Sequence, residues 1–133
     1  MHRSSLKCIV AVGAAVLLAA QSGPASAREL AQQTSRDRGV TVQVKPVDLS
    51  PGAKSWAFEV VLDTHSQDLA DDLVRTTMLE AGGATLAPTG WEGDPPGGHH
   101  RKGVLRFAPI TPMPEAVELL IARPGESAPR SFR

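Results

Sequence analysis

Residues 55–63, Ser-Trp-Ala-Phe-Glu-Val-Val-Leu-Asp, decide the fold class of this chain. Large apolar residues occupy every second position, so Trp56, Phe58, Val60 and Leu62 share one face of an extended strand. Full burial of such side chains stabilises a fold by about 1.5–3 kcal/mol each. The segment therefore predicts a strand that contributes much of the protein core.

Short strands are also predicted on both sides of this segment. Residues 40–45 alternate with three valines on one face, and residues 103–108 and 116–122 follow the same pattern. Residues 130–133 are expected to pair as a last edge strand. Prolines and glycines separate these segments about every ten residues, a spacing typical of β-sandwiches. We therefore expect an all-β protein, an antiparallel immunoglobulin-like β-sandwich of about seven strands.

The segment after the core strand leaves two interpretations open, helix or loop for residues 66–74. Ser66 with the acidic residues after it is able to cap a helix. The β-branched residues that follow, and Gly82-Gly83, favour a hairpin. We favour a helical turn at 68–72 followed by strands at 74–79 and 84–86.

The N-terminal region has the pattern of a signal peptide. Arg3 and Lys7 precede a 13-residue apolar run, residues 8–20, and Ala25-Ser26-Ala27 is a cleavage motif. The run is short for a transmembrane helix, although an uncleaved anchor is the alternative. We expect a signal peptide at 1–27, a flexible polar tether at 28–39 and one β-sandwich domain at 40–133, located in the periplasm or secreted.

Cleavage after Ala27 would change the chemistry that the chain offers. Cys8 is the single cysteine, so the exported form would have no disulfide, no thiol nucleophile and no thiolate metal site. The chain has 14 Lys and Arg against 14 Asp and Glu, and loss of Arg3 and Lys7 leaves a small negative excess. This balance argues against nucleic-acid binding and against membrane binding after cleavage.

The most unusual stretch is Gly90-Trp91-Glu92-Gly93-Asp94-Pro95-Pro96-Gly97-Gly98-His99-His100-Arg101-Lys102-Gly103. Pro-Pro followed by Gly-Gly cannot continue a helix or a central strand, so a shaped loop is predicted here. We call residues 91–102 the Pro-Gly-His loop. It would deliver a histidine pair to the start of the next strand.

Three histidines remain after cleavage, and they lie in two places. His65 follows the core strand, whereas His99 and His100 lie in the Pro-Gly-His loop. If both segments share one end of the sandwich, His65, His99 and His100 with Asp63 or Asp94 would form a nitrogen and oxygen site suited to Cu(II), Zn(II) or Ni(II).

Other interpretations of the loop remain open. The N–H groups of Gly97 and Gly98 could form an anion-binding nest. A structural role is equally open, in which Trp91 packs as a plug and Asp94 or Glu92 pairs with Arg101 or Lys102. We expect no enzyme, because no nucleophile elbow and no phosphate-binding loop is present.

The motifs Asp63-Thr64-His65-Ser66 and Trp91 to Arg101, of the form W-x-G-x-P-P-G-G-H-H-R, resemble a family of small, uncharacterised exported bacterial β-sandwich proteins. The resemblance covers residues 40–133 and implies an exported β domain. The layout is also similar to that of periplasmic copper carriers, but no N-terminal histidine follows Ala27 and no Met-rich loop is present.

These observations predict an exported, non-enzymatic binding or accessory module that holds a divalent metal through its loop histidines. The alternative is a structural or protein-interaction module without metal, which would contact a protein partner through the Pro-Gly-His loop around Trp91.

Overall fold

The computed structural model describes residues 31–133, so the predicted signal peptide and the first residues of the predicted tether lie outside the described residues. The described part contains nine strands and one short helix. In chain order these are β1 (Gln33–Asp37), β2 (Val40–Asp48), β3 (Trp56–Thr64), α1 (Leu73–Thr76), β4 (Thr77–Ala81), β5 (Ala84–Leu86), β6 (Gly90–Gly93), β7 (His100–Phe107), β8 (Val117–Ile121) and β9 (Arg130–Phe132).

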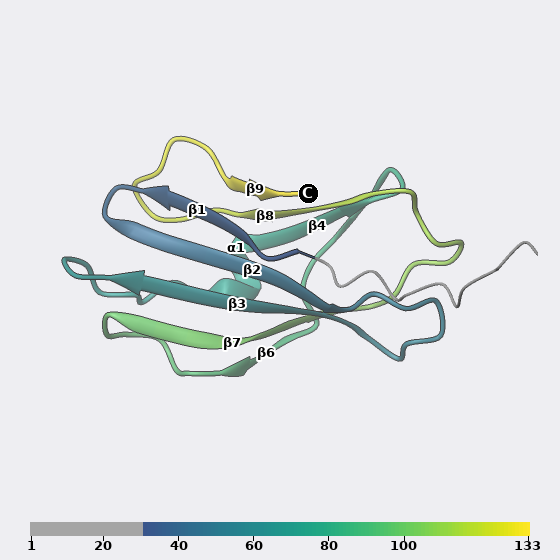
Figure 1. Ribbon diagram of the computed structural model, residues 1–133, viewed down its shortest axis with the longest axis horizontal. Coiled ribbons are helices and arrows are strands. Elements are labelled where there is room, and N and C mark those ends of the chain that lie inside the picture. Colours follow the sequence, from purple (N-terminus) through teal and green to yellow (C-terminus); the bar gives the residue numbers. More distant parts are fainter. Residues whose placement is uncertain (1–30) are drawn as a thin grey trace, which may run out of the picture.

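The strands form two antiparallel sheets, seen as two layers in Figure 1. One sheet has the order β1-β2-β3-β7-β6 and the other β5-β4-β8-β9. The all-β class and the antiparallel pairing are thus confirmed, and the architecture is consistent with a β-sandwich. In residues 31–133 no helix is long and apolar enough to cross a membrane.

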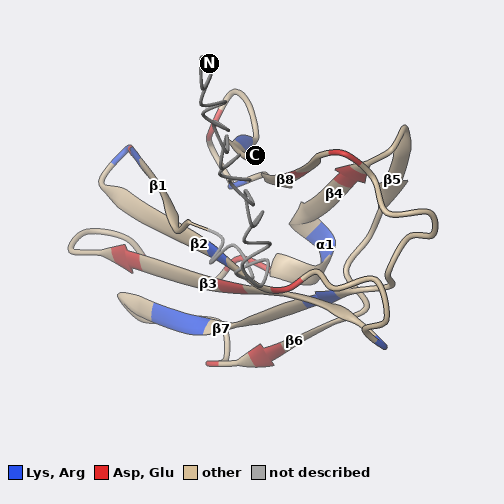
Figure 2. Ribbon diagram, turned by 45° about the vertical axis from the view of Figure 1, so that its right-hand side comes forward, with Lys and Arg blue, Asp and Glu red and all other residues tan. Residues whose placement is uncertain are grey.

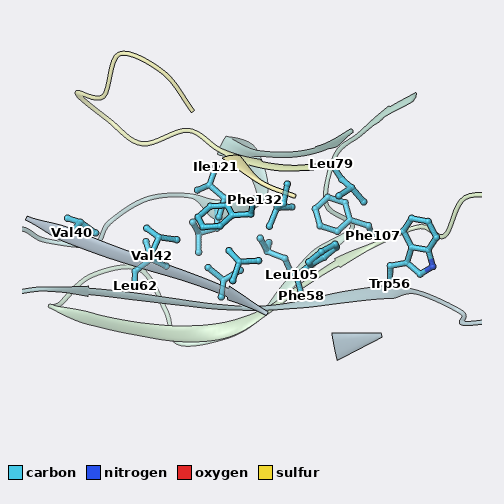
Figure 3. Packing of buried hydrophobic residues seen from close by; sticks show 14 of the residues in the cluster. Val40, Val42, Trp56, Phe58, Leu62, Leu79, Leu105, Phe107, Ile121 and Phe132 are labelled. Carbon is cyan, nitrogen blue, oxygen red and sulfur yellow. The ribbon is translucent and has the colours of Figure 1, made fainter. Parts of the chain in front are cut away.

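The core lies between the two sheets, as the alternation predicts. Trp56, Phe58, Val60 and Leu62 of β3 are each at most 2% exposed. The second sheet contributes a smaller apolar set, made of Leu79, Ala81, Leu119, Ile121 and Phe132. Figure 3 shows side chains from the two layers pointing toward one another. The rings of Phe58 and Phe107 meet edge to face, with centroids 5.7 Å apart.

The predicted flexible tether is wrong for residues 33–37, which form strand β1 at the edge of the first sheet. β1 pairs with β2 from Gln33↔Val44 to Asp37↔Val40. Arg38 and Gly39 connect the two strands, both with positive φ (46° and 74°), as a two-residue hairpin turn requires. An edge strand needs only backbone hydrogen bonds, so its polar composition does not prevent pairing.

The helical turn lies later than predicted. Helix α1 begins after Asp72, whose carboxylate accepts a hydrogen bond from the Arg75 N–H, so Asp72 caps the helix instead of Ser66. Residues 74–76 are therefore helical, whereas the hairpin of β4 and β5 around Gly82-Gly83 is confirmed. The count of nine strands exceeds the expected seven because of the two polar or Gly-rich edge strands, β1 and β6.

A buried chain of charges closes one end of the sandwich. Arg123 donates to both carboxylate oxygens of Asp71, at 2.8 and 3.2 Å, and lies 3.4 Å from Glu126. Glu126 in turn accepts from Arg130 at 2.6 and 3.0 Å. We call Asp71, Arg123, Glu126 and Arg130 the buried charge network. Arg130 also donates to the carbonyl groups of Ser35, Asp37 and Val40, and so ties β9 to the β1–β2 hairpin.

Trp91 covers one edge of the core. It lies on β6 opposite Leu105 and packs against the core cluster. Its ring occupies the space above Gly103, where an added Cβ would lie 2.5 Å from the indole Cζ2 atom. The indole can therefore take this position only because residue 103 is a glycine.

The contact of Trp91 with Gly103 predicts the effect of a single methyl group. Gly103→Ala would displace the indole or the strand, and we expect it to lower the free energy of unfolding by about 1–3 kcal/mol, the usual cost of overpacking. Gly90→Ala is the matched control, because a Cβ there has no neighbour within 4 Å. Urea denaturation of both variants measures the difference, and equal stability of the two would contradict this packing.

The buried charge network predicts a loss of stability in acid. Hydrogen bonds from Arg130 lower the pKa of Glu126 from its ordinary value of 4.5. A carboxyl group with a lowered pKa in the folded state stabilises the fold above the ordinary value, and this contribution is lost as the pH falls through the folded-state pKa. We expect Glu126→Gln to be less stable at pH 7 and to lose less stability than the wild type below about pH 4.5. Thermal unfolding from pH 7 to pH 3 tests this, and parallel curves would refute it.

Candidate functional site

The predicted metal ligands lie at one end of the sandwich, and two of them meet. Asp63 near the end of β3 is the register partner of His100, the first residue of β7. The Nδ1 atom of His100 is hydrogen-bonded to a carboxylate oxygen of Asp63. Both side chains are about half exposed, 59% for His100 and 48% for Asp63. The expectation that the two segments share one end is therefore confirmed for this pair.

The other two predicted ligands do not join the pair. His65 and His99 are exposed, and the contact of His99 with the β3 end is through its backbone carbonyl, which accepts from the Thr64 N–H at 2.9 Å. Within residues 31–133, no three His, Cys, Asp or Glu side chains gather as a metal site would require. Asp63 faces Nδ1 of His100. In known metal sites a carboxylate in this position orients the histidine ring.

The Pro-Gly-His loop is held by its own chain. The N–H of Gly97 donates to the Leu69 carbonyl at 2.9 Å, and the N–H of Gly98 donates to the Asp68 carboxylate at 2.7 Å. In return, the Gly98 carbonyl accepts from the Leu69 N–H at 2.9 Å. Both donors of the predicted anion nest are therefore already used, and the nest interpretation is wrong.

The structural interpretation of the loop is confirmed in its main feature. The indole N–H of Trp91 donates to the Asp94 carbonyl at 2.9 Å, and the Arg101 guanidinium lies 5.4 Å from the ring centroid. Asp94 binds the backbone N–H of Lys102 at 2.8 Å. Glu92 pairs with Arg106 instead of Arg101 or Lys102, and this contact lowers the pKa of Glu92.

Arg101 is the loop residue whose position differs most from expectation. It is 2% exposed and donates to the carbonyls of Leu69 and Asp71 at 3.1 and 2.7 Å. The neighbouring Lys102 points to the other face, where it lies 3.5 Å from Glu59 of β3. Basic β7 residues thus lie beside acidic residues of β3 (Figure 2). Lys102 is thus paired with Glu59, whereas Arg101 is bound by backbone carbonyl groups.

A second candidate site lies between the sheets, at the end of the sandwich remote from the buried charge network. It is a cleft of about 650 Å³, lined mainly by apolar side chains from both sheets and from the proline-rich connector before β8. We call it the apolar cleft. Its apolar lining consists of Ala31, Val44, Pro46, Val47, Leu49, Phe58, Met113, Pro114, Ala116, Val117 and Phe132.

The apolar cleft has a buried floor and an exposed rim. Val44, Phe58 and Phe132 are at most 5% exposed, whereas Val47 is 59% and Met113 46% exposed. Large exposed apolar residues beside a deep apolar surface are typical of interaction sites. Pro46, which was expected to follow the strand at 40–45, lies inside β2 and lines the cleft.

Few polar groups of the described residues line the apolar cleft, and they differ in their hydrogen-bond and ion-pair partners. Asp48 accepts hydrogen bonds from the N–H and hydroxyl of Ser50, at 3.0 and 2.7 Å, and these bonds lower the pKa of Asp48. Arg133 lies 3.2 Å from Glu118, so its charge is matched. Glu115 is exposed on the rim.

No protein-family model, curated protein or solved structure matches this chain significantly. The resemblance to small exported bacterial proteins stays a prediction.

The metal hypothesis can be tested at the Asp63–His100 pair. We expect the pair to hold Zn(II) or Cu(II) only weakly, because protein zinc sites use at least three protein ligands. In calorimetric titration of the purified protein, His100→Ala should abolish the weak binding and His65→Ala should leave it unchanged. Tight 1:1 binding that requires His65, His99 and His100 together would show that the three histidines converge after all.

Proposed function

We propose that this chain is an exported, non-enzymatic binding module that recognises a segment of a partner protein in its apolar cleft. The observation that carries the proposal is the cleft itself, with about 650 Å³ of space between two sheets and with Val47 and Met113 exposed at its rim. Binding sites in proteins are typically concave, largely apolar and of this size.

The architecture suits such a role. We propose a likeness to immunoglobulin domains in layout, that is, two packed sheets that present binding surfaces at their ends. The connectivity differs, because β1, β2 and β3 follow one another in a single sheet, whereas immunoglobulin domains divide strands B and C between the sheets. The rigid core would keep the cleft open without a ligand.

The proposal includes a location outside the cytoplasm. Residues 1–27 have the sequence pattern of a cleaved signal peptide, and the remaining residues contain no cysteine that an oxidising compartment would affect. We therefore place the module in the periplasm or outside the cell.

The apolar cleft is a better candidate than the Pro-Gly-His loop for contact with a partner. A partner that used the loop would need Trp91, but this side chain packs on the core and its N–H is bonded to Asp94. Val47 and Met113, by contrast, are exposed apolar side chains on the rim of a cleft. The exposed apolar surface that a partner would cover therefore lies at the apolar cleft.

Binding of a neutral apolar fluorophore tests the proposed site. We expect 1-N-phenylnaphthylamine to bind saturably at one site, and the double variant Val47→Asp, Met113→Asp to weaken this binding at least about tenfold, because charged groups replace rim area worth about 25 cal/mol per Å².

Met78→Asp is the matched control for this experiment. Met78 is 45% exposed, nearly the same as Met113, but it does not line the apolar cleft. Its variant should bind the fluorophore as the wild type does. An equal loss in both variants, or no saturable binding to the wild type, would remove the support for the cleft.

A further inference from the structure

We infer that Met113 is an oxidation site, at which conversion of the thioether to the sulfoxide by a peroxide weakens the binding of apolar groups in the apolar cleft. This inference rests on the proposed function and adds a means of regulation to it. It is drawn from the position of Met113 on the rim, from the connector that carries it, and from the presence of a second methionine, Met78, that is equally exposed elsewhere.

The proline-rich connector before β8 fixes the position of Met113. Prolines flank Met113 on both sides, and a proline restricts its own φ and the backbone of the residue before it. Ile110 before it and Val117 after it pack against the core cluster. An added Cβ at Gly82 would lie 3.4 Å from the Cβ of Pro114, so the connector lies against the turn between β4 and β5. The Met113 side chain is therefore held beside the apolar cleft, which it lines.

Methionines are the side chains of this chain that a peroxide would attack after cleavage. Cysteine and methionine are the residues that peroxides commonly oxidise, and residues 28–133 contain two methionines and no cysteine. Met113 is 46% exposed and Met78 is 45% exposed. Oxidation would thus fall on both, but of the two only Met113 lines the apolar cleft.

The reaction requires only the thioether and the peroxide. A lone pair of the sulfur attacks one peroxide oxygen, and the S–O bond forms as the O–O bond breaks. The hydroxide that leaves takes the proton of the transferred hydroxyl group and becomes water. Sulfur loses two electrons and the peroxide gains them. A polar sulfoxide then replaces an apolar side chain, so a ligand covers less apolar area at the rim and must desolvate a polar group.

Hydrogen peroxide treatment of the purified protein tests this inference. We expect the Kd for 1-N-phenylnaphthylamine to rise about threefold, a smaller loss than two charged rim substitutions would cause. Peptide mass spectrometry measures the sulfoxide at each methionine. Methionine sulfoxide reductases of both stereospecificities should return the Kd to its starting value, because they restore the thioether.

Two leucine variants make the test specific. Leucine is apolar, close to methionine in volume and without a sulfur to oxidise. In Met113→Leu the ratio of the Kd after treatment to the Kd before it should be about one, whatever the starting Kd. In Met78→Leu the ratio should be about three, as in the wild type, because Met78 does not line the apolar cleft.

The possible outcomes separate this inference from the function on which it rests. Sulfoxide at Met113 without a change in Kd would overturn the regulation and leave the cleft as a binding site. An equal rise in Kd for Met113→Leu and the wild type would do the same, as would resistance of Met113 under conditions that oxidise Met78. Absence of saturable fluorophore binding to the untreated wild type would overturn the proposed function itself, and this inference with it.

Discussion

The arrangement of this fold depends most on one contact, between the Arg130 guanidinium and the β1–β2 hairpin. Arg130 holds three carbonyl groups near the hairpin turn, and Glu126 matches its charge. Through Arg123 and Asp71, the same network reaches the segment that leads into α1. Buried ion pairs stabilise little in net terms, but loss of one member leaves an unmatched buried charge and is costly. The network therefore specifies how the two sheets meet at this end, while apolar burial supplies most of the stability.

The alternation of apolar and polar residues predicts the central strands but not the edge strands β1 and β6. Val42 and Leu62 lie opposite each other in the core because each strand puts every second residue inside. β1 was missed because its side chains are polar, and an edge strand is specified by backbone pairing with a neighbour. The burial of Arg101, in contrast, can be predicted from the sequence. Leu105 and Phe107 point inward, and the same parity carried back along β7 places Gly103 and Arg101 inside.

The two candidate sites differ in how far they could be predicted. Asp63 and His100 meet because they are register partners on adjacent strands, and the sequence placed both near strand ends. The conformation of the loop, however, is set by hydrogen bonds between Gly97, Gly98 and the segment at Leu69, which no local pattern reveals. The apolar cleft is less predictable still. Its lining comes from β1, β2, β3, β8, β9 and the proline-rich connector, so it exists only once the two sheets have packed.

The positions of the two tryptophans also give the protein a built-in optical probe. The chain has two tryptophans and no tyrosine, so its near-ultraviolet emission comes from these two indoles. Trp56 is fully buried and its N–H reaches the carbonyl of Ser50, a residue that lines the apolar cleft. Trp91 lies beneath a guanidinium at the opposite sheet edge. Their emission spectra therefore report on two separate regions of the molecule, one next to the cleft and one next to the Pro-Gly-His loop.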